Sequence, residues 1–241
     1  MVHIGIIPDG NRRWCKSKDI EYKLTNLQDI WFNILLLQLR ELSINSFEFL
    51  EKVTSLTFYV CSIENIRRND NTSEYIYLFL NKLFILYNNY EKIIDELYKN
   101  ETEEKKTLIR CFIKGIIDNL NIVPIGELHE LPENIRNELL LLKKQNKKTN
   151  KYNLYLGIAY DFNKDLINFG VNTNENYNRE QSQIDILIRT GGELRLSGFF
   201  PTHINYAEFF YYKKYWPEIT CKDINNVIYE FINKRQRRFG K

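Results

Sequence analysis

A chain of 241 residues is long enough for one large domain with a buried core, and 44% hydrophobic with 27% charged residues is an ordinary globular composition. The formal charge of +3 excludes a general nucleic-acid binder, in which basic residues dominate the balance. The sequence contains no run of about 18 uninterrupted apolar residues, so we do not expect a membrane-spanning helix. The first residues do not resemble a signal peptide. The four cysteines are far apart, without a C-x-x-C pair, which favours reduced thiols. We therefore expect one domain, residues 1–241, in the cytoplasm.

Hydrophobic periodicity predicts strands that alternate with helices. In chain order, the pattern predicts a strand at 3–7, a helix at 20–43, a strand at 55–61, a helix at 73–99, a break at 99–106, a helix at 108–120, a strand at 121–125, a helix at 132–142, strands at 152–158 and 184–188, and a closing helix at 223–237. Residues 171–183, rich in Asn, Glu and Gln, are expected to form a mobile loop. This alternation indicates a single α/β domain with a central, mostly parallel sheet surrounded by helices.

A first group of polar residues follows the first predicted strand, in the order Pro8-Asp9-Gly10-Asn11-Arg12-Arg13-Trp14. Gly10 permits a sharp turn, and the two arginines offer planar donors for phosphate oxygens. A lone carboxylate is out of place in a purely anion-binding turn, unless Asp9 holds Mg²⁺ that bridges phosphate oxygens. A solvated polar turn with a capping Asp explains the composition about equally well.

A second group follows the strand expected at 184–188. It consists of Arg189-Thr190-Gly191-Gly192-Glu193-Leu194-Arg195-Leu196-Ser197, and we expect Arg189, Arg195 and Ser197 to grip a second phosphate group. Downstream, Glu208 is a candidate to share the metal. Taken alone, the segment is also typical of a glycine turn with surface ion pairs, but two strand-to-turn phosphate sites in one chain make that explanation weaker.

A third, weaker group, Ser62-Ile63-Glu64-Asn65-Ile66-Arg67-Arg68, follows the strand expected at 55–61. Because strand ends on one edge of a parallel sheet meet at one crevice, we expect all three groups to face the same cleft. Other site motifs are excluded. The glycine spacing at residues 5–12 lacks the Lys-Ser/Thr of a P-loop, the three histidines have no metal-binding spacing, and no D-D-x-x-D sequence occurs.

Together these segments resemble the cis-prenyltransferases, the family of undecaprenyl diphosphate synthase and dehydrodolichyl diphosphate synthase. Asp9-Gly10-Asn11-x-Arg13-Trp14 is similar to its first signature, and Ser62-x-Glu64-Asn65 with Arg68 to its middle motif. The stretch from Ile188 to Ser197, then Tyr206-Ala207-Glu208 and Trp216-Pro217, is similar to the large C-terminal signature. Arg238-Phe239-Gly240 resembles the Arg-x-Gly close of the family. The resemblance runs from end to end of the chain.

The resemblance implies Mg²⁺-dependent condensation of isopentenyl diphosphate with an allylic prenyl diphosphate in the cis configuration, giving a polyprenyl diphosphate and pyrophosphate. It implies that Asp9 and Glu208 hold the metal and that Asp9, Asn11, Ser62 and Asn65 take part in catalysis. It assigns the allylic diphosphate to Gly10, Asn11, Arg12, Arg13, Trp14 and Arg68, and isopentenyl diphosphate to Arg189, Arg195, Ser197, Arg238 and Gly240. An apolar tunnel, walled by the helix at 73–99, would take the growing chain.

The resemblance further implies a homodimer, with peripheral membrane contact through its apolar product and no nucleic-acid partner. Two alternatives stay open. A short-chain or irregular prenyl diphosphate synthase of the same fold would couple small units without long elongation. A non-catalytic partner subunit of a heteromeric enzyme would keep the fold, but such subunits typically lose the first signature, which this chain retains at Asp9, Asn11 and Arg13.

Overall fold

The computed structural model describes residues 1–20, 52–171 and 183–235 of the chain. Its centre is a six-stranded sheet in the order β3-β4-β2-β1-β5-β6, in which every neighbouring pair is parallel. The strands are β1 (Val2–Ile7), β2 (Val53–Tyr59), β3 (Leu120–Ile125), β4 (Tyr152–Gly157), β5 (Ile186–Arg189) and β6 (Glu208–Tyr211). The expected α/β domain with a parallel sheet is confirmed.

The central strands are the most apolar ones. Every residue of β1 and β5 is buried, as expected for strands covered on both faces. β6 is half-exposed, because it forms an edge of the sheet beside β5 alone. The sequence pattern did not predict β6, since a four-residue edge strand carries too short a periodic signal.

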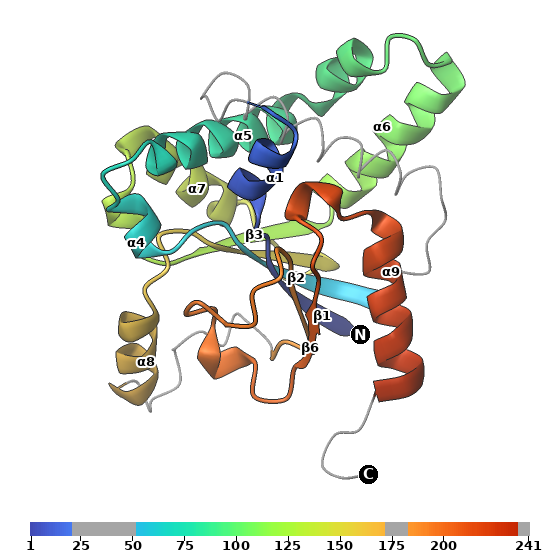
Figure 1. The fold of residues 1–241 in the computed structure, drawn as a ribbon. Helices are drawn as coiled ribbons and strands as arrows, with labels where there is room; N and C mark the ends of the chain where they lie inside the picture. The colour runs from blue at the N-terminus through green and yellow to red at the C-terminus, as the bar shows by residue number, and fades with distance from the viewer. Residues whose placement is uncertain (21–51, 172–182, 236–241) are drawn as a thin grey trace.

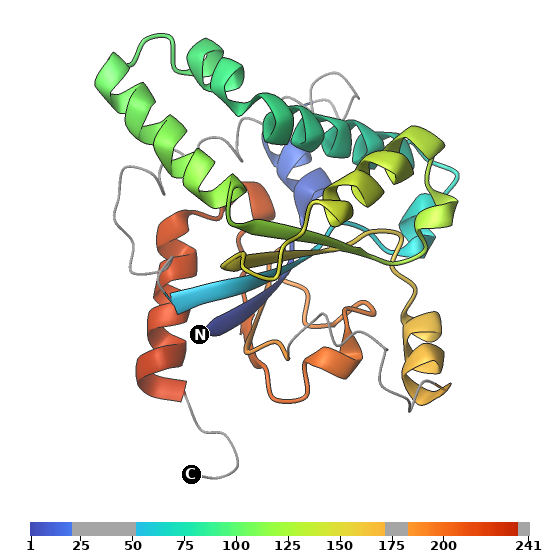
Figure 2. The same ribbon diagram turned by 180° about the vertical axis from the view of Figure 1, so that it is seen from behind.

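Helices cover one face of the sheet, and the segment between β5 and β6 lies on the other face together with one helix (Figures 1 and 2). Side chains of α5 (Thr72–Leu97) and α7 (Glu133–Lys144) pack on β3 and β4, and those of α9 (Cys221–Glu230) pack on β1, β2 and β5. On the opposite face, Ile7, Tyr59 and Leu187 lie against Phe199 and Phe200. α8 (Phe162–Val171) lies on this second side, next to the 3₁₀ turn η2 (Pro201–His203).

Two helices form an arm that projects beyond the sheet (Figures 1 and 2). α6 (Glu103–Ile117) packs back on the distal part of α5, where Ile94, Tyr98, Ile109 and Ile113 make a small separate core. The pattern predicted a break over 99–106, but α6 already begins at Glu103. Thr102 caps this end by accepting a hydrogen bond from the Lys105 amide, and acidic residues in a first turn favour the helix dipole.

The remaining elements are short. They are α1 (Asn11–Ser17), α4 (Ile63–Ile66), the 3₁₀ turns η1 (Leu128–Glu130) and η3 (Trp216–Glu218), and the π-helix η4 (Phe231–Arg235) that continues α9. The helix expected at 20–43 and nearly all of the loop expected at 171–183 lie outside the described residues. The four cysteines are free thiols. Among the described helices, none is long and apolar enough to cross a bilayer.

Candidate active site

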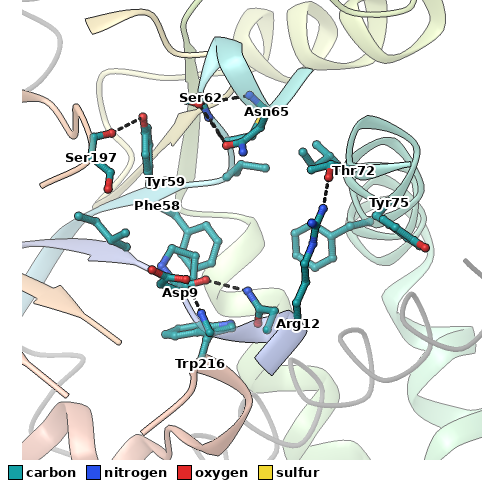
Figure 3. Close-up of a pocket in the computed structure, with 18 of the residues that line it drawn as sticks. Asp9, Arg12, Phe58, Tyr59, Ser62, Asn65, Thr72, Tyr75, Ser197 and Trp216 are labelled. Carbon is teal, nitrogen blue, oxygen red and sulfur yellow. Dashed lines mark hydrogen bonds between the residues drawn. The ribbon is translucent and has the colours of Figure 1, made fainter. Parts of the chain in front are cut away.

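The carboxyl ends of β1, β2 and β5 open into one cleft with a volume of about 610 Å³ (Figure 3). The strand register brings these ends together, since Ile7 of β1 lies opposite Arg189 of β5. Most of the predicted site residues line the cleft: Asp9, Gly10, Asn11, Arg12, Arg13, Ser62, Asn65, Arg68, Arg189, Arg195 and Ser197. The expectation that the three groups share one cleft is confirmed.

Gly10 forms the sharp turn between β1 and α1. Its φ of 97° lies in the left-handed region, and a Cβ there would come within 2.4 Å of the Tyr215 ring. The backbone amide of Trp216 donates a hydrogen bond of 3.0 Å to the carbonyl oxygen of Asp9. The first motif is thus covered closely by the segment around Tyr215 and Trp216, and only glycine fits at residue 10.

Asp9 lies between two guanidinium groups. Its Oδ2 is 2.7 Å from Nη2 of Arg189, and its Oδ1 is 3.4 Å from Nη2 of Arg13. Oδ1 also accepts a 2.6 Å hydrogen bond from the Gly10 amide. Burial alone would raise the pKa of Asp9, but the hydrogen bonds from Arg189 and Gly10 and the charges of Arg189 and Arg13 hold it below its ordinary value. Asp9 is therefore a permanent anion at neutral pH.

Arg189 is fixed by its surroundings, with only 3% of its side chain exposed. Besides Asp9, it donates a 2.9 Å hydrogen bond to Oγ of Ser197 and another to the carbonyl oxygen of Arg195. Its buried Nε and the buried Oδ1 of Asn11 have no hydrogen-bond partner among the described residues. Buried polar atoms without partners are unusual, and a bound ligand, ion or water is one way to supply the missing contact.

Glu193 joins the two main motifs. Its Oε1 is 3.3 Å from Nη1 of Arg13, and its Oε2 is 2.5 Å from Nη1 of Arg195. The ring of Tyr215 lies on another side of Arg13, 5.6 Å from the guanidinium carbon, a cation–π distance. One carboxylate thus contacts an arginine from each of the two residue groups that are predicted to bind phosphate.

Ser62 and Asn65 meet at the start of α4. The backbone N–H of Asn65 donates a 3.3 Å hydrogen bond to Oγ of Ser62. In return, the side-chain Oδ1 of Asn65 accepts a 3.0 Å hydrogen bond from the backbone N–H of Ser62, so the pair forms a capping box. Figure 3 shows both side chains at the rim of the cleft, on the side of Tyr59. Tyr59 donates a 3.2 Å hydrogen bond to the carbonyl oxygen of Ser197, and burial raises its pKa above the ordinary value.

An apolar wall completes the cleft, which sequence motifs alone did not specify. Phe58, Tyr75, Ile76 and Phe79 line it together with Trp216 and Pro217. Three of these side chains come from the first turns of α5, which agrees with the expectation that this helix walls an apolar space. The helical spacing of residues 75, 76 and 79 was the available signal. The cleft therefore combines a cationic floor with a hydrocarbon-like side.

The structure does not bring every predicted residue to this cleft. Glu208 lies opposite Ile186 at the beginning of β6, whereas Asp9 and Arg189 lie at the far ends of their strands. Glu208 and Trp14 are absent from the cleft lining. The geometry of one chain thus does not support a metal shared by Asp9 and Glu208. Arg238 and Gly240 lie outside the described residues.

The residues of the cleft fit a magnesium ion that takes most of its ligands from water and substrate rather than from the protein. No group of three or more His, Cys, Asp or Glu side chains converges within the part of the chain that the structure describes. Mg²⁺ usually binds proteins through one or two carboxylates and completes its shell with water and substrate phosphates. The half-buried, ionised Asp9 at the mouth of an arginine-lined cleft is compatible with that mode of binding.

A parallel α/β sheet with five arginines and an ionised aspartate at its strand ends, beside an apolar wall, defines a class of site for phosphorylated substrates with a hydrocarbon part. The chain matches the prenyltransferase family described as undecaprenyl diphosphate synthase over residues 7–240. It belongs to this family and is therefore a prenyltransferase of the cis type, whose general reaction is magnesium-dependent condensation of prenyl diphosphates.

Similar proteins come from archaea and bacteria. A tritrans,polycis-undecaprenyl-diphosphate synthase (geranylgeranyl-diphosphate specific) of Sulfurisphaera tokodaii is 29% identical, over 99% of this chain and 87% of the relative. An isoprenyl transferase of Helicobacter pylori is 26% identical, over 99% and 96% of the two chains. A crystal structure of a probable undecaprenyl diphosphate synthase from Campylobacter jejuni shares the fold, with a TM-score of 0.64 and 20% identity over 99% of this chain and 98% of that one.

Proposed function

We propose that the cleft joins isopentenyl diphosphate to an allylic prenyl diphosphate and extends it in cis, releasing pyrophosphate at each step. The observation that carries this proposal is the juxtaposition of five arginines and Asp9 with the apolar wall of Phe58, Tyr75 and Phe79. A prenyl diphosphate has the same two-part chemistry, an anionic head and a hydrocarbon tail.

Arg189, Arg195 and Ser197 are the proposed ligands of isopentenyl diphosphate. Arg189 already donates to Ser197, so both side chains point to the same place, and the unpartnered Nε of Arg189 remains as a donor. Gly10, Asn11, Arg12, Arg13 and Arg68 are the proposed ligands of the allylic diphosphate. The α5 part of the apolar wall begins at Tyr75, one turn after Thr72, whose hydroxyl accepts a hydrogen bond from Arg12 of this second set. This is the side on which a hydrocarbon tail has to leave the diphosphate.

The chemistry requires no nucleophilic side chain. The allylic C–O bond breaks, the electrons of the isopentenyl double bond form the new C–C bond, and a proton leaves the isopentenyl unit. Arginines that are already in place stabilise the negative charge on the departing pyrophosphate. We assign Ser62 and Asn65 to the neighbourhood of the departing proton, because their capping box holds both side chains at the rim of the cleft.

Asp9 is the proposed protein ligand of Mg²⁺. When bound, the ion would neutralise phosphate charge and polarise the bond to the leaving group. The arginines on either side of Asp9 hold its carboxylate ionised and oriented toward the cleft. Glu208 is the other proposed metal ligand. Because it lies far from Asp9 within one chain, it would have to reach the metal from a second copy of the chain.

The allylic primer is proposed to be a preformed prenyl diphosphate of several units. Five of the archaeal relatives are named as specific for geranylgeranyl diphosphate, with identities of 26–29% over 99% of this chain. This likeness favours geranylgeranyl diphosphate as the primer to test first. It leaves the two alternatives, a short-chain or irregular synthase and a non-catalytic subunit, as outcomes of the assay below.

A homodimer is also proposed. Leu194, Tyr206 and Phe209 are large apolar residues that lie 76%, 61% and 38% exposed on or near the edge strand β6. An unpaired sheet edge with exposed apolar side chains is a typical interaction surface. We further propose that contact with lipid is peripheral and passes through the apolar product.

One assay tests the proposal. Radiolabelled isopentenyl diphosphate is incubated with Mg²⁺ and dimethylallyl, geranyl, farnesyl or geranylgeranyl diphosphate, and the products are sized by chromatography. Long products that require a primer and Mg²⁺ support the proposed function. A product of one or two condensations identifies a short-chain enzyme, and absence of any product with all primers contradicts a catalytic role for this chain alone.

A further inference from the structure

Asp70, a residue of none of the three motifs, engages two of the arginines that line the cleft. It lies in the loop between α4 and α5. Its Oδ2 is 3.1 Å from Nη2 of Arg12 and 3.0 Å from Nη2 of Arg68. Both arginines line the cleft, whereas Asp70 itself does not. The two guanidinium groups come from segments almost 60 residues apart in the chain, and this carboxylate is where they meet.

The other carboxylate oxygen of Asp70 faces the start of α5. Oδ1 accepts a 3.0 Å hydrogen bond from the Thr72 amide and another from the Thr72 hydroxyl. The same hydroxyl accepts a hydrogen bond from Nη2 of Arg12, as Figure 3 shows for Arg12 and Thr72. These contacts lower the pKa of Asp70 to about 2. The hydrogen bonds from Thr72 are the main cause, and the nearby Arg12 contributes further.

The groups around the Asp70 carboxylate are of the kinds that bind phosphate in proteins. Two guanidiniums, a hydroxyl and the backbone amide of Thr72 at a helix N-terminus surround the carboxylate, and all three kinds of donor occur in phosphate sites of proteins. Asp70 is fixed in the chain and carries one negative charge, so it is a built-in anion. Any diphosphate that approaches Arg12 and Arg68 meets both a competitor for their donors and a like charge.

We propose that Asp70 is a positioning residue that pairs Arg12 with Arg68 in the free enzyme and competes with the allylic diphosphate for both. Binding of the diphosphate then requires Arg12 and Arg68 to exchange a carboxylate for phosphate oxygens. The competition weakens the hold on the diphosphate and so favours release of pyrophosphate after each condensation. This inference rests on the proposed function, because it assumes that Arg12 and Arg68 are diphosphate ligands.

The discriminating variant is Asp70→Asn. The amide oxygen still accepts from Thr72, so the start of α5 keeps its hydrogen bonds, while the charge that opposes phosphate is lost. Exposed ion pairs are individually weak, so we expect a modest gain, with pyrophosphate bound about fivefold more tightly. Because Asp70, Arg12 and Arg68 are all partly exposed, this gain should shrink when the salt concentration rises about tenfold.

Asp95→Asn is the matched control. Asp95 is also an exposed aspartate of the α5 region, and its partner is Arg110 in the projecting arm. The control changes the net charge by the same amount but removes no carboxylate from the cleft arginines. Asp70→Glu, which keeps the charge, should bind pyrophosphate as the wild type does. Thermal unfolding of each variant shows whether the fold is retained.

Calorimetric titration of the full chain with inorganic pyrophosphate in Mg²⁺ buffer, together with steady-state kinetics, tests the proposal. The expected result for Asp70→Asn is tighter pyrophosphate binding, a lower KM for the allylic primer and an unchanged KM for isopentenyl diphosphate. Unchanged or weaker pyrophosphate binding by Asp70→Asn overturns the competition. If instead Arg12→Gln and Arg68→Gln both bind pyrophosphate as the wild type does, the assignment of the allylic site fails, which is a separate outcome.

Discussion

The carboxylate of Asp9 and the guanidinium of Arg189 meet across the ends of two adjacent parallel strands, with 2.7 Å between Oδ2 and Nη2. Arg189 is almost completely buried, while Asp9 reaches the cleft. The buried arginine therefore orients the Asp9 carboxylate. The position of Arg189 is in turn set by the sheet register, in which it lies opposite Ile7. This pair links the first motif of the sequence to the second.

Asp9→Ala should reduce turnover about 100-fold or more at saturating Mg²⁺, without loss of the fold. Removal of one preorganised electrostatic group costs on the order of 3 kcal/mol of transition-state stabilisation. Steady-state kinetics over a range of Mg²⁺ concentrations measure the effect, and circular dichroism checks the fold. A variant that keeps most of its kcat would contradict the assignment of Asp9 as the metal ligand.

The ion pair of Asp9 also predicts a pH dependence of stability. The pKa of Asp9 is below its ordinary value of 3.8 in the folded chain, so the unfolded chain binds the proton more readily. The contribution of the ion pair is therefore fully present above about pH 4 and is lost as the pH falls through the lower, folded pKa. Denaturant unfolding of the wild type and Asp9→Asn should differ most at neutral pH and converge in acid. A constant difference down to pH values of about 2 would show that the charge of Asp9 is irrelevant.

Gly10→Ala and Gly192→Ala form a matched pair for the turn at the first motif. Both glycines have positive φ, 97° and 79°, so each substitution carries a left-handed strain of about 1–2 kcal/mol. At Gly192 a Cβ meets nothing within 4 Å, but at Gly10 it would lie 2.4 Å from the Tyr215 ring. We expect Gly10→Ala to lower the free energy of unfolding by about 2 kcal/mol more than Gly192→Ala. Equal losses would mean that Tyr215 moves aside at little cost.

The location of the site was predictable because its residues follow buried strands. Asp9 and Arg189 each come after an apolar run, and parallel strands place such residues at one edge. Asp70 and Glu193 were not predictable as partners of Arg12 and Arg13, because these contacts join positions 58 and 180 residues apart. Pairing over such separations depends on loop geometry, which periodicity does not encode.

Short elements were the main omissions in the fold. α1 has seven residues, of which Trp14 and Cys15 are its apolar ones, so it shows no helical period. The turn at Gly10, rather than an apolar face, determines where it begins. Glu208 shows the limit of a motif from the other direction. A motif places residues along the chain, but the pairing of Glu208 with Ile186 puts it at the other end of the strands from Asp9.

Arg195→Ala should raise the KM for isopentenyl diphosphate about tenfold or more, and the KM for the allylic primer much less. Charged hydrogen bonds contribute about 1.5–3 kcal/mol, and this side chain is proposed to contact isopentenyl diphosphate. Some effect on the primer is expected, because Glu193 bridges Arg195 and Arg13. Arg67→Ala is the control, since Arg67 is an exposed arginine paired with Glu130 outside the cleft lining. Equal increases in both KM values would show that the two phosphate sites are assigned wrongly.

The final prediction concerns residues 238–241, which lie outside the described part of the chain. By resemblance to the family, Arg238 and Gly240 are expected to complete the isopentenyl diphosphate site of the partner in a homodimer. Deletion of 238–241 should then reduce activity strongly while the dimer persists in analytical ultracentrifugation. Co-expression with an Asp9→Ala chain creates heterodimers in which one site combines an intact Asp9 with an intact tail from its partner, so part of the activity should return. A fully active truncated chain would exclude a role for the tail, and a truncated chain that regains nothing from the Asp9→Ala partner would mean that the tail acts within its own chain.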